Sequence, residues 1–251
     1  YYIKGTEQVG EWRDMHCRIE GDAVNELQRI FLRIWNRTTG QHVSGMKYYR
    51  GGTPTVFDGL KPDTTATKGR KMIGIINREP RVTPKIMRTF YVNAIEQAQD
   101  SIHIINPYFT LIPTVTKALT RAIRRGVKVE IMLSAKSDIP LTPDCVFYNA
   151  HRLMKRGAHV WLYKPGFHHS KVMMVDSTFC TVGTANLDSR SLRYDYETNA
   201  LIFDKGTTDE LSTMFERDKL NSHTLDKEYW RNRSKWKKFV GWLGNLLTPF
   251  L

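Results

Sequence analysis

Short apolar runs alternate with helical patterns between residues 71 and 163, and this alternation restricts the fold more than any other feature of the sequence. The apolar runs predict strands over residues 71–77, 101–106, 127–134 and 158–163. Helical spacing predicts three helices between them, the first capped by Thr83 ahead of Pro84, the others over residues 113–126 and 143–157. Crossovers of this length join parallel strands, so we expect an α/β domain with a largely parallel sheet covered on both faces.

Size, charge and cysteine content limit the class of protein. The 251 residues, 41% of them apolar, can supply a substantial core, which excludes disorder of the whole chain. The net charge of +13 favours a polyanionic partner: nucleic acid, an anionic membrane surface or a phosphate-bearing substrate. Three cysteines, an odd number, argue against a disulfide framework and for a reducing compartment, and no Cys/His cluster typical of a metal site is present. No apolar run approaches the roughly 18 to 20 residues of a membrane-spanning helix.

A segment rich in Gly, Pro, Thr and Lys over residues 49–70 is typical of a linker or surface loop and divides the chain. Residues 14–19 before it resemble residues 197–202, because an acidic residue opens a short predicted strand in both, and a turn and a helix follow. This repeat predicts that residues 1–48 end one lobe and that residues 71–225 form a second, similar lobe. Because the chain opens in what reads as the middle of a domain, we expect it to be part of a longer protein.

Two β-prone runs, Val172–Val175 and Phe179–Val182, flank a polar turn and predict a hairpin with its tip near Ser177. Pairing about this tip sets residue 169 opposite 185 and residue 171 opposite 183. Because side chains alternate along a strand, His169 and Lys171 share one face. The residues after the second strand return to the same end of the hairpin.

Thr184 and Asn186 therefore come back to the strand end that carries His169 and Lys171. A nucleophile or base, a cation and a carboxamide at one strand end would suit the binding of a phosphoryl group. Asp176 lies five residues beyond Lys171, about 16 Å along an extended strand, so its position predicts that it shapes the turn. A buried hairpin with surface polar residues is the alternative for the whole segment.

Tyr108 and Phe109 follow the end of a predicted strand, where α/β proteins place ligand-binding loops. Core packing is the alternative for both aromatic side chains, and the sequence leaves the two explanations open.

The ordered set of polar residues resembles a known signature. The pattern His169-x-Lys171-x4-Asp176-x6-Gly183-Thr184-x-Asn186 looks like the HKD motif of the phospholipase D superfamily. Four further segments resemble bacterial cardiolipin synthases in the same order, namely Trp12-Arg-Asp14-x-His16, Asn106-Pro-Tyr-Phe109, Asn186-Leu-Asp-x-Arg190-Ser191 and Glu197-x-Asn199. The resemblance implies that residues 71–225 form a phospholipase D-like α/β/α sandwich lobe with a mixed, largely parallel sheet.

In this family two such motifs, one in each lobe, build a single site. The resemblance implies that His169, Lys171, Asp176 and Glu197 are catalytic, His169 as the nucleophile or as the general acid. It also implies that Lys171, Thr184 and Asn186 hold the substrate phosphate, that Glu197 orients a catalytic imidazole, and that Asp14 is its counterpart in the first lobe. Thr184 stands where serine is usual and keeps the hydroxyl group. No metal or other cofactor is implied, and since one motif is present, the partner needed is a missing N-terminal HKD lobe of the same protein.

The resemblance favours a phosphatidyltransferase of the cardiolipin synthase type, which transfers a phosphatidyl group between two phosphatidylglycerol molecules, gives cardiolipin and glycerol, and passes through a phosphohistidine intermediate. It implies a bacterial inner-membrane location with the catalytic part at the membrane surface. A phosphodiesterase or nuclease that completes its site by dimerising is the alternative, although the Trp-rich tail and the first-lobe remnant disfavour nucleic acid as a partner. An inactive lobe that only binds lipid or protein is a third hypothesis.

Residues 226–251 are rich in both cationic and aromatic side chains. Trp236, Phe239, Leu243 and Leu246 fall on one face of a helix, the pattern of a basic amphipathic helix lying in a membrane interface. Docking of that apolar face onto the domain is the alternative.

Overall fold

The structure is a computed structural model that describes residues 5–49, 71–140 and 142–247. The predicted linker at 49–70 lies, apart from Tyr49, outside the described residues. Along the chain the elements are β1 (Glu11–Arg13), α1 (Ala23–Thr39), the 3-10 helix η1 (Met46–Tyr48), β2 (Met72–Arg78), α2 (Ile86–Gln97), β3 (Ser101–Ile105), α3 (Pro113–Arg124), β4 (Lys128–Ser134), α4 (Thr142–Met154), β5 (His159–Tyr163), β6 (Gly166–His168), β7 (Val172–Val175), β8 (Phe179–Gly183), α5 (Ser189–Arg193), β9 (Glu197–Phe203), α6 (Lys205–Lys219), β10 (Ser222–Thr224), α7 (Lys227–Asn232) and α8 (Lys235–Leu247).

The main sheet has the strand order β10-β5-β4-β3-β7-β8-β9-β2. Strands β3, β4 and β5, which are linked through α3 and α4, are parallel, as the alternation of strands and helices predicts. The neighbouring pairs β3/β7, β7/β8, β8/β9, β9/β2 and β5/β10 are antiparallel. Strands β2, β3, β4, β5 and β8 thus run in one direction, and the mixed α/β fold is confirmed.

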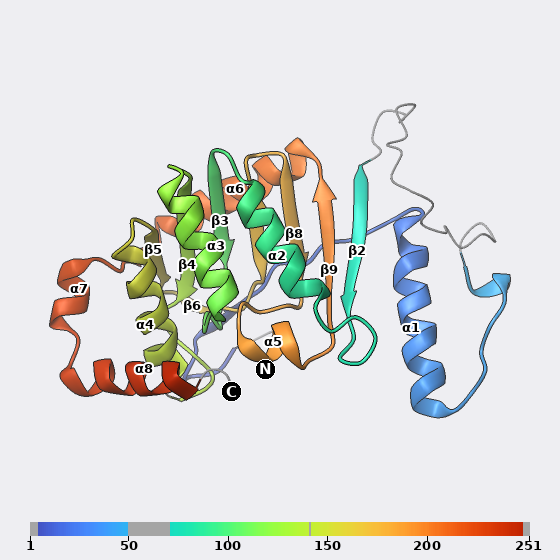
Figure 1. The fold of residues 1–251 in the computed structure, drawn as a ribbon, viewed down its shortest axis with the longest axis horizontal. Helices are drawn as coiled ribbons and strands as arrows, with labels where there is room; N and C mark the ends of the chain where they lie inside the picture. The colour runs from blue at the N-terminus through green and yellow to red at the C-terminus, as the bar shows by residue number, and fades with distance from the viewer. Residues whose placement is uncertain (1–4, 50–70, 141, 248–251) are drawn as a thin grey trace.

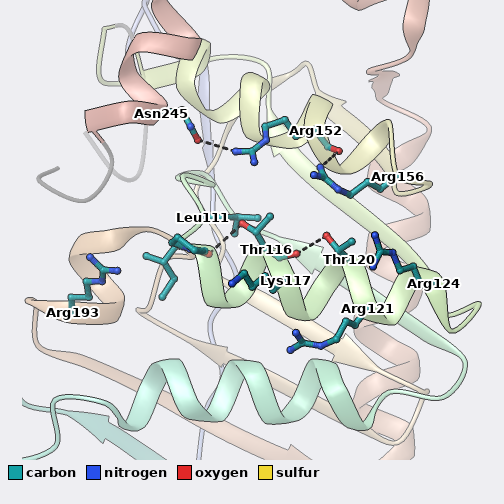
Figure 2. A pocket seen from close by; sticks show the side chains of 12 residues that line it. Leu111, Thr116, Lys117, Thr120, Arg121, Arg124, Arg152, Arg156, Arg193 and Asn245 are labelled. Carbon is teal, nitrogen blue, oxygen red and sulfur yellow. Dashed lines mark hydrogen bonds between the residues drawn. The ribbon is translucent and has the colours of Figure 1, made fainter.

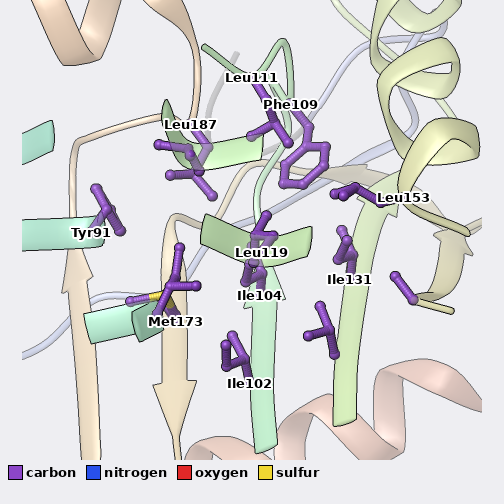
Figure 3. Packing of buried hydrophobic residues seen from close by; sticks show 14 of the residues in the cluster. Tyr91, Ile102, Ile104, Phe109, Leu111, Leu119, Ile131, Leu153, Met173 and Leu187 are labelled. Atoms are coloured by element: carbon purple, nitrogen blue, oxygen red, sulfur yellow. The ribbon is translucent and has the colours of Figure 1, made fainter. Parts of the chain in front are cut away.

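Helices cover both faces of this sheet (Figure 1), with α2, α3 and α4 on one face and α6 on the other. Strand β4 is buried on both sides: Ile131 and Leu133 face one helical layer and Met132 faces the other. The larger core contains Leu119 of α3 and Phe109, which pack over the same face as Ile131 (Figure 3). The smaller core forms beneath α6. The chain is therefore an α/β/α sandwich whose sheet is buried on both sides.

The β7/β8 hairpin has the predicted register. Val172 pairs with Val182 and Val175 pairs with Phe179, which centres the turn on residue 177. Three residues, 176–178, connect the paired strands. Asp176 and Ser177 both have positive φ, 52° and 54°, and aspartate tolerates this conformation better than most residues. The N–H of Gly183 donates to the carbonyl of Lys171 at 3.2 Å, so the pairing continues to the end where the polar residues meet.

Two predictions of local structure were wrong. Thr83 does not cap α2, because its hydroxyl donates to the carbonyl of Asn77 and accepts from the N–H of Glu79, which closes the turn after β2. Residues 14–19 form no strand; β1 ends at Arg13, and its register with β6 ends at His168.

The N-terminal segment packs on the second lobe at two places. Strand β1 pairs with β6 in a separate parallel ribbon. Helix α1 stands beside β2 (Figure 1), where Arg33 and Arg37 form ion pairs with the buried carboxylate of Glu79. Residues 5–49 therefore contribute directly to the surface and edge of the second lobe.

Helix α8 docks through its glycine side. Gly241 packs against the carbonyl of Asp144 and Gly244 against the sulfur of Cys145, so closely that a methyl group at either glycine would overlap α4. The opposite side carries exposed large side chains, among them Trp236 at 69% and Leu246 at 52% exposure. The predicted apolar face is therefore present, and it points away from the domain. In the described part of the chain, no helix combines the length and apolar character needed to cross a bilayer.

Candidate active site

The pairing of β1 with β6 brings the N-terminal segment to His169. Trp12 lies beside Phe167 and Arg13 beside His168 in this parallel ribbon. The N–H of His169 then donates to the carbonyl of Arg13 at 2.7 Å, which extends the ladder by one residue. Asp14 follows Arg13 directly, so this register places its side chain next to the imidazole of His169.

The imidazole of His169 has a defined proton arrangement. Its Nδ1 lies 2.9 Å from Oδ2 of Asp14, and its Nε2 lies 2.7 Å from Nζ of Lys171. A lysine ammonium can only donate, so Nε2 accepts and Nδ1 carries the proton that is donated to Asp14. The lone pair of Nε2 is thereby directed at Nζ of Lys171.

Aromatic side chains enclose this imidazole. The ring of Trp12 lies 4.7 Å, that of Phe167 5.6 Å and that of Tyr108 6.4 Å from the His169 ring, measured between centroids. Tyr108 is held by a hydrogen bond from its hydroxyl to Asp138 at 2.6 Å. The aromatic residues restrict the rotation of His169 and leave its Nε2 side beside Lys171.

The buried charges perturb one another. Burial lowers the pKa of Lys171 to about 8, although Asp14 and Glu197 favour its charged form, and its exposed fraction is only 6%. Burial opposes ionisation of Asp14, but the hydrogen bond and charge of His169 and the charge of Lys171 lower its pKa below the ordinary value. An ionised aspartate can therefore stabilise positive charge on the neighbouring imidazole.

A second acidic residue lies one strand further on. Glu197 at the start of β9 accepts a hydrogen bond from the hydroxyl of Thr184, and burial raises its pKa although Ser191 and Thr184 donate to it. The Oδ1 atom of Asn186 is buried and has no hydrogen-bond partner in the described part of the structure. The carboxamide of Asn186 thus keeps an acceptor that no described protein group uses.

The structure separates Asp176 from the other candidate catalytic residues. Its carboxylate accepts the backbone N–H groups of Gln99, Asp100 and Ser101 at 2.8 to 2.9 Å and so ties the hairpin turn to the start of β3. His169 and Lys171 lie at the opposite end of β7. This position agrees with a role in the turn and gives Asp176 no contact with the reacting groups.

The resemblance implies the same role for Asp14 and Glu197, to orient a catalytic imidazole, but it does not indicate which imidazole each contacts. The structure shows that Asp14 hydrogen-bonds to His169. Trp12 and Phe167 were not identified as neighbours of the imidazole, and only the pairing of β1 with β6 reveals them. For Tyr108 and Phe109 the sequence left a ligand-binding loop and core packing as alternatives. Tyr108 faces His169, whereas Phe109 is fully buried in the core.

The neighbouring His168 has a different environment. It is buried, its Nε2 lies 3.2 Å from Asp218, and Arg13 pairs with the same carboxylate at 2.8 Å. Burial lowers the pKa of His168 despite this carboxylate. His168 therefore supports the packing of β6 on α6, and His169 is the histidine of this pair that reaches the site.

The arrangement fits a nucleophilic imidazole with a cation beside it. Nε2 of His169 would become the attacking atom once Lys171 transfers its hydrogen bond from Nε2 to a phosphate oxygen, and Asp14 would stabilise the charged imidazole that attack produces. Within the described residues, no group of three or more His, Cys, Asp or Glu side chains is placed to hold a metal ion.

Comparison with solved structures supports the fold. Nuc from Salmonella typhimurium, titled a phospholipase D family member, superimposes with a TM-score of 0.54 and 17% identity, over 63% of this chain and 100% of that chain. The phosphatidylserine synthase of Haemophilus influenzae Rd KW20 also has a TM-score of 0.54, with 16% identity over 71% of this chain and 45% of that chain. At these identities the likeness concerns the fold alone.

Sequence comparison identifies the family. A cardiolipin synthase of Listeria monocytogenes is 32% identical over 250 residues, which cover 100% of this chain and 50% of the relative. Cardiolipin synthase 1 of Staphylococcus epidermidis is 32% identical over 98% of this chain and 48% of that protein. The chain thus spans about half the length of the curated relatives it matches and corresponds to their C-terminal half. Since residues 91–219 match the family described as "Cardiolipin synthase, PLD-like domain", the chain belongs to that family.

Proposed function

We propose that this chain supplies one half of the active site of a phosphatidyltransferase of the cardiolipin synthase type. The enzyme would transfer a phosphatidyl group from one phosphatidylglycerol to the hydroxyl of another and release glycerol. The observation that carries the proposal is the contact of His169 with Asp14 and Lys171, which presents a lone pair on Nε2 beside a buried cation.

The proposed reaction has two transfers. Nε2 of His169 attacks phosphorus, the bond from phosphorus to the glycerol oxygen breaks, and an acid protonates that oxygen as glycerol leaves. The hydroxyl of a second phosphatidylglycerol then attacks the phosphohistidine, the P–N bond breaks, and the hydroxyl proton passes to the group that acted as the acid. Lys171 would hold a phosphate oxygen during both transfers, with Thr184 and Asn186 beside it.

The acid that protonates glycerol would be a second histidine, from a lobe beyond this chain. Glu197 supports this step of the proposal, because it is a buried carboxylate whose hydrogen bonds come from Ser191 and Thr184. No histidine of the described chain hydrogen-bonds to it. An imidazole delivered to Glu197 would complete a pair of histidines, each next to its own acidic residue.

We also propose that the enzyme works at an anionic membrane surface, in bacteria at the inner membrane. The docking of α8 supports this, since Gly241 and Gly244 fix the helix on α4 while its Trp, Phe and Leu side chains stay exposed. The cations at Lys235, Lys237 and Lys238 begin the same helix and suit an anionic surface.

The alternative is a phosphodiesterase or nuclease that completes its site by dimerising. The presence of a single His-x-Lys motif favours it. The contact between Asp14 and His169 argues against it, because the carboxylate comes from the segment that resembles the end of a first lobe, which a one-motif dimer would not need.

The experiment uses the complete reading frame that contains this chain, purified with His169 intact and as His169→Asn, and also the 251-residue chain alone. We expect the complete protein to convert phosphatidylglycerol vesicles to cardiolipin and glycerol, with a loss of several orders of magnitude in His169→Asn, and no turnover by the chain alone. Hydrolysis of DNA by the chain alone would favour the dimeric nuclease. Full turnover by His169→Asn would contradict the proposed mechanism.

A further inference from the structure

A second candidate site lies on the helical surface between α3, α4, α5 and α8. It is a pocket of about 520 Å³ lined by six basic side chains (Figure 2), namely Lys117, Arg121, Arg124, Arg152, Arg156 and Arg193. Among the residues that the structure describes, no acidic side chain lines it, and it shares no lining residue with the cluster around His169. We call it the basic pocket. Its volume is in the range of pockets that hold small ligands.

The charges of the basic pocket are poorly compensated. Arg121 pairs with Glu96. With described residues, Arg152 and Arg156 make hydrogen bonds only to neutral oxygens, those of Asn245 and of the Arg152 carbonyl, at 3.4 and 2.6 Å. In the described part of the chain, neither Lys117 nor Arg124 forms an ion pair. Gathering so many like charges around one space is unfavourable unless an anion occupies it, and guanidinium groups match phosphate oxygens in geometry.

One wall of the basic pocket belongs to the helix with the exposed apolar face. Asn245 of α8 lines the pocket; on the helix it is one turn after Trp242 and directly before Leu246. Both flanking side chains are exposed, at 44% and 52%. An anion bound in the pocket would therefore lie next to apolar surface that the protein does not cover.

We propose that the basic pocket binds the phosphate headgroup of an anionic phospholipid while the acyl chains lie along the apolar face of α8. A ligand that joins a phosphate to a long apolar part matches both features, whereas a nucleic acid would leave Leu243 and Leu246 without a role. The inference rests on the proposed membrane association of α8 and is independent of the transfer reaction at His169.

The test compares two pairs of substitutions that remove the same charge. Lys117→Gln with Arg124→Gln alters exposed positions of the pocket, and Lys164→Gln with Arg217→Gln alters exposed positions elsewhere. Binding of the 251-residue chain is measured by sedimentation with phosphatidylcholine vesicles, with and without phosphatidylglycerol, and with soluble glycerol phosphate and single-stranded DNA.

We expect the pocket pair to weaken binding to phosphatidylglycerol vesicles by about 30-fold, since each basic residue near an anionic surface contributes about a factor of five. The control pair should change it less than threefold. An equal loss of vesicle binding in both pairs would mean diffuse electrostatic attraction and would overturn the proposal. A change in binding to DNA or glycerol phosphate without a change in vesicle binding would also overturn it. So would a failure of the unaltered chain to bind these vesicles. Transfer by the complete protein in detergent, measured for the pocket pair, separates this outcome from a failure of the proposed function.

Discussion

Replacing Lys171 with methionine removes the cation of the site. It should also raise the free energy of unfolding relative to the wild type more at neutral pH than at alkaline pH. The ordinary lysine pKa is 10.5 and that of Lys171 is about 8, because burial disfavours its charge. A group whose pKa is lower in the folded state releases its proton on folding between these two values, so stability rises with pH there. Over pH 7 to pH 10 this contribution amounts to about 2.5 kcal/mol.

The free energy of unfolding of the wild-type chain and of Lys171→Met, measured with urea at several pH values, tests this reasoning. Between pH 7 and pH 10 the free energy of unfolding of the wild type should rise by about 2.5 kcal/mol more than that of the variant. Lys164→Met, which removes an exposed lysine, should stay parallel to the wild type. If the pH dependence of the free energy of unfolding is the same for the wild type and Lys171→Met, then burial does not lower the pKa of Lys171 and the reasoning is refuted.

Three further substitutions test other parts of the structure. Asp176→Asn should cost about 1 to 3 kcal/mol in the free energy of unfolding, because an amide nitrogen would face one of three backbone N–H groups, and catalysis by the complete protein should persist. Gly241→Ala should lower the melting temperature through overlap with Asp144 at a cost of about 1 to 3 kcal/mol, whereas Gly206→Ala, which has room for its methyl group, should not. Asp14→Asn should reduce kcat of the complete protein by about 10²-fold or more with little change in melting temperature, and an unaltered kcat would contradict the assigned role.

The sequence was most informative where its patterns are local. The register of the β7/β8 hairpin follows from alternation about Ser177, and the crossovers between β3, β4 and β5 follow from the spacing of apolar residues. Both are short-range regularities, and both predictions are confirmed. Thr83 shows the limit of such rules, because a threonine before proline suits a helix cap, and its hydroxyl instead closes the preceding turn.

The site itself depends on contacts between distant parts of the chain. Asp14 and His169 are 155 positions apart, and no periodicity in either segment indicates that β1 pairs with β6. The predicted strand over 14–19 failed for the same reason, since pairing partners decide where a strand ends. The apolar face of α8 could be predicted from the spacing of its residues. Whether that face points toward the domain or away from it could not, because it depends on the contact of Gly241 and Gly244 with α4.

The pairing of β1 with β6 also links reactivity to the completion of folding. A free histidine exchanges its proton between the two ring nitrogens, and only the arrival of Asp14 on one side and Lys171 on the other fixes Nε2 as the acceptor. Because Asp14 arrives through a ribbon that closes between the two ends of a long stretch of chain, an incompletely folded chain would carry an ordinary surface imidazole at position 169. The acceptor nitrogen of this imidazole is therefore defined only in a chain in which the β1/β6 ribbon has formed.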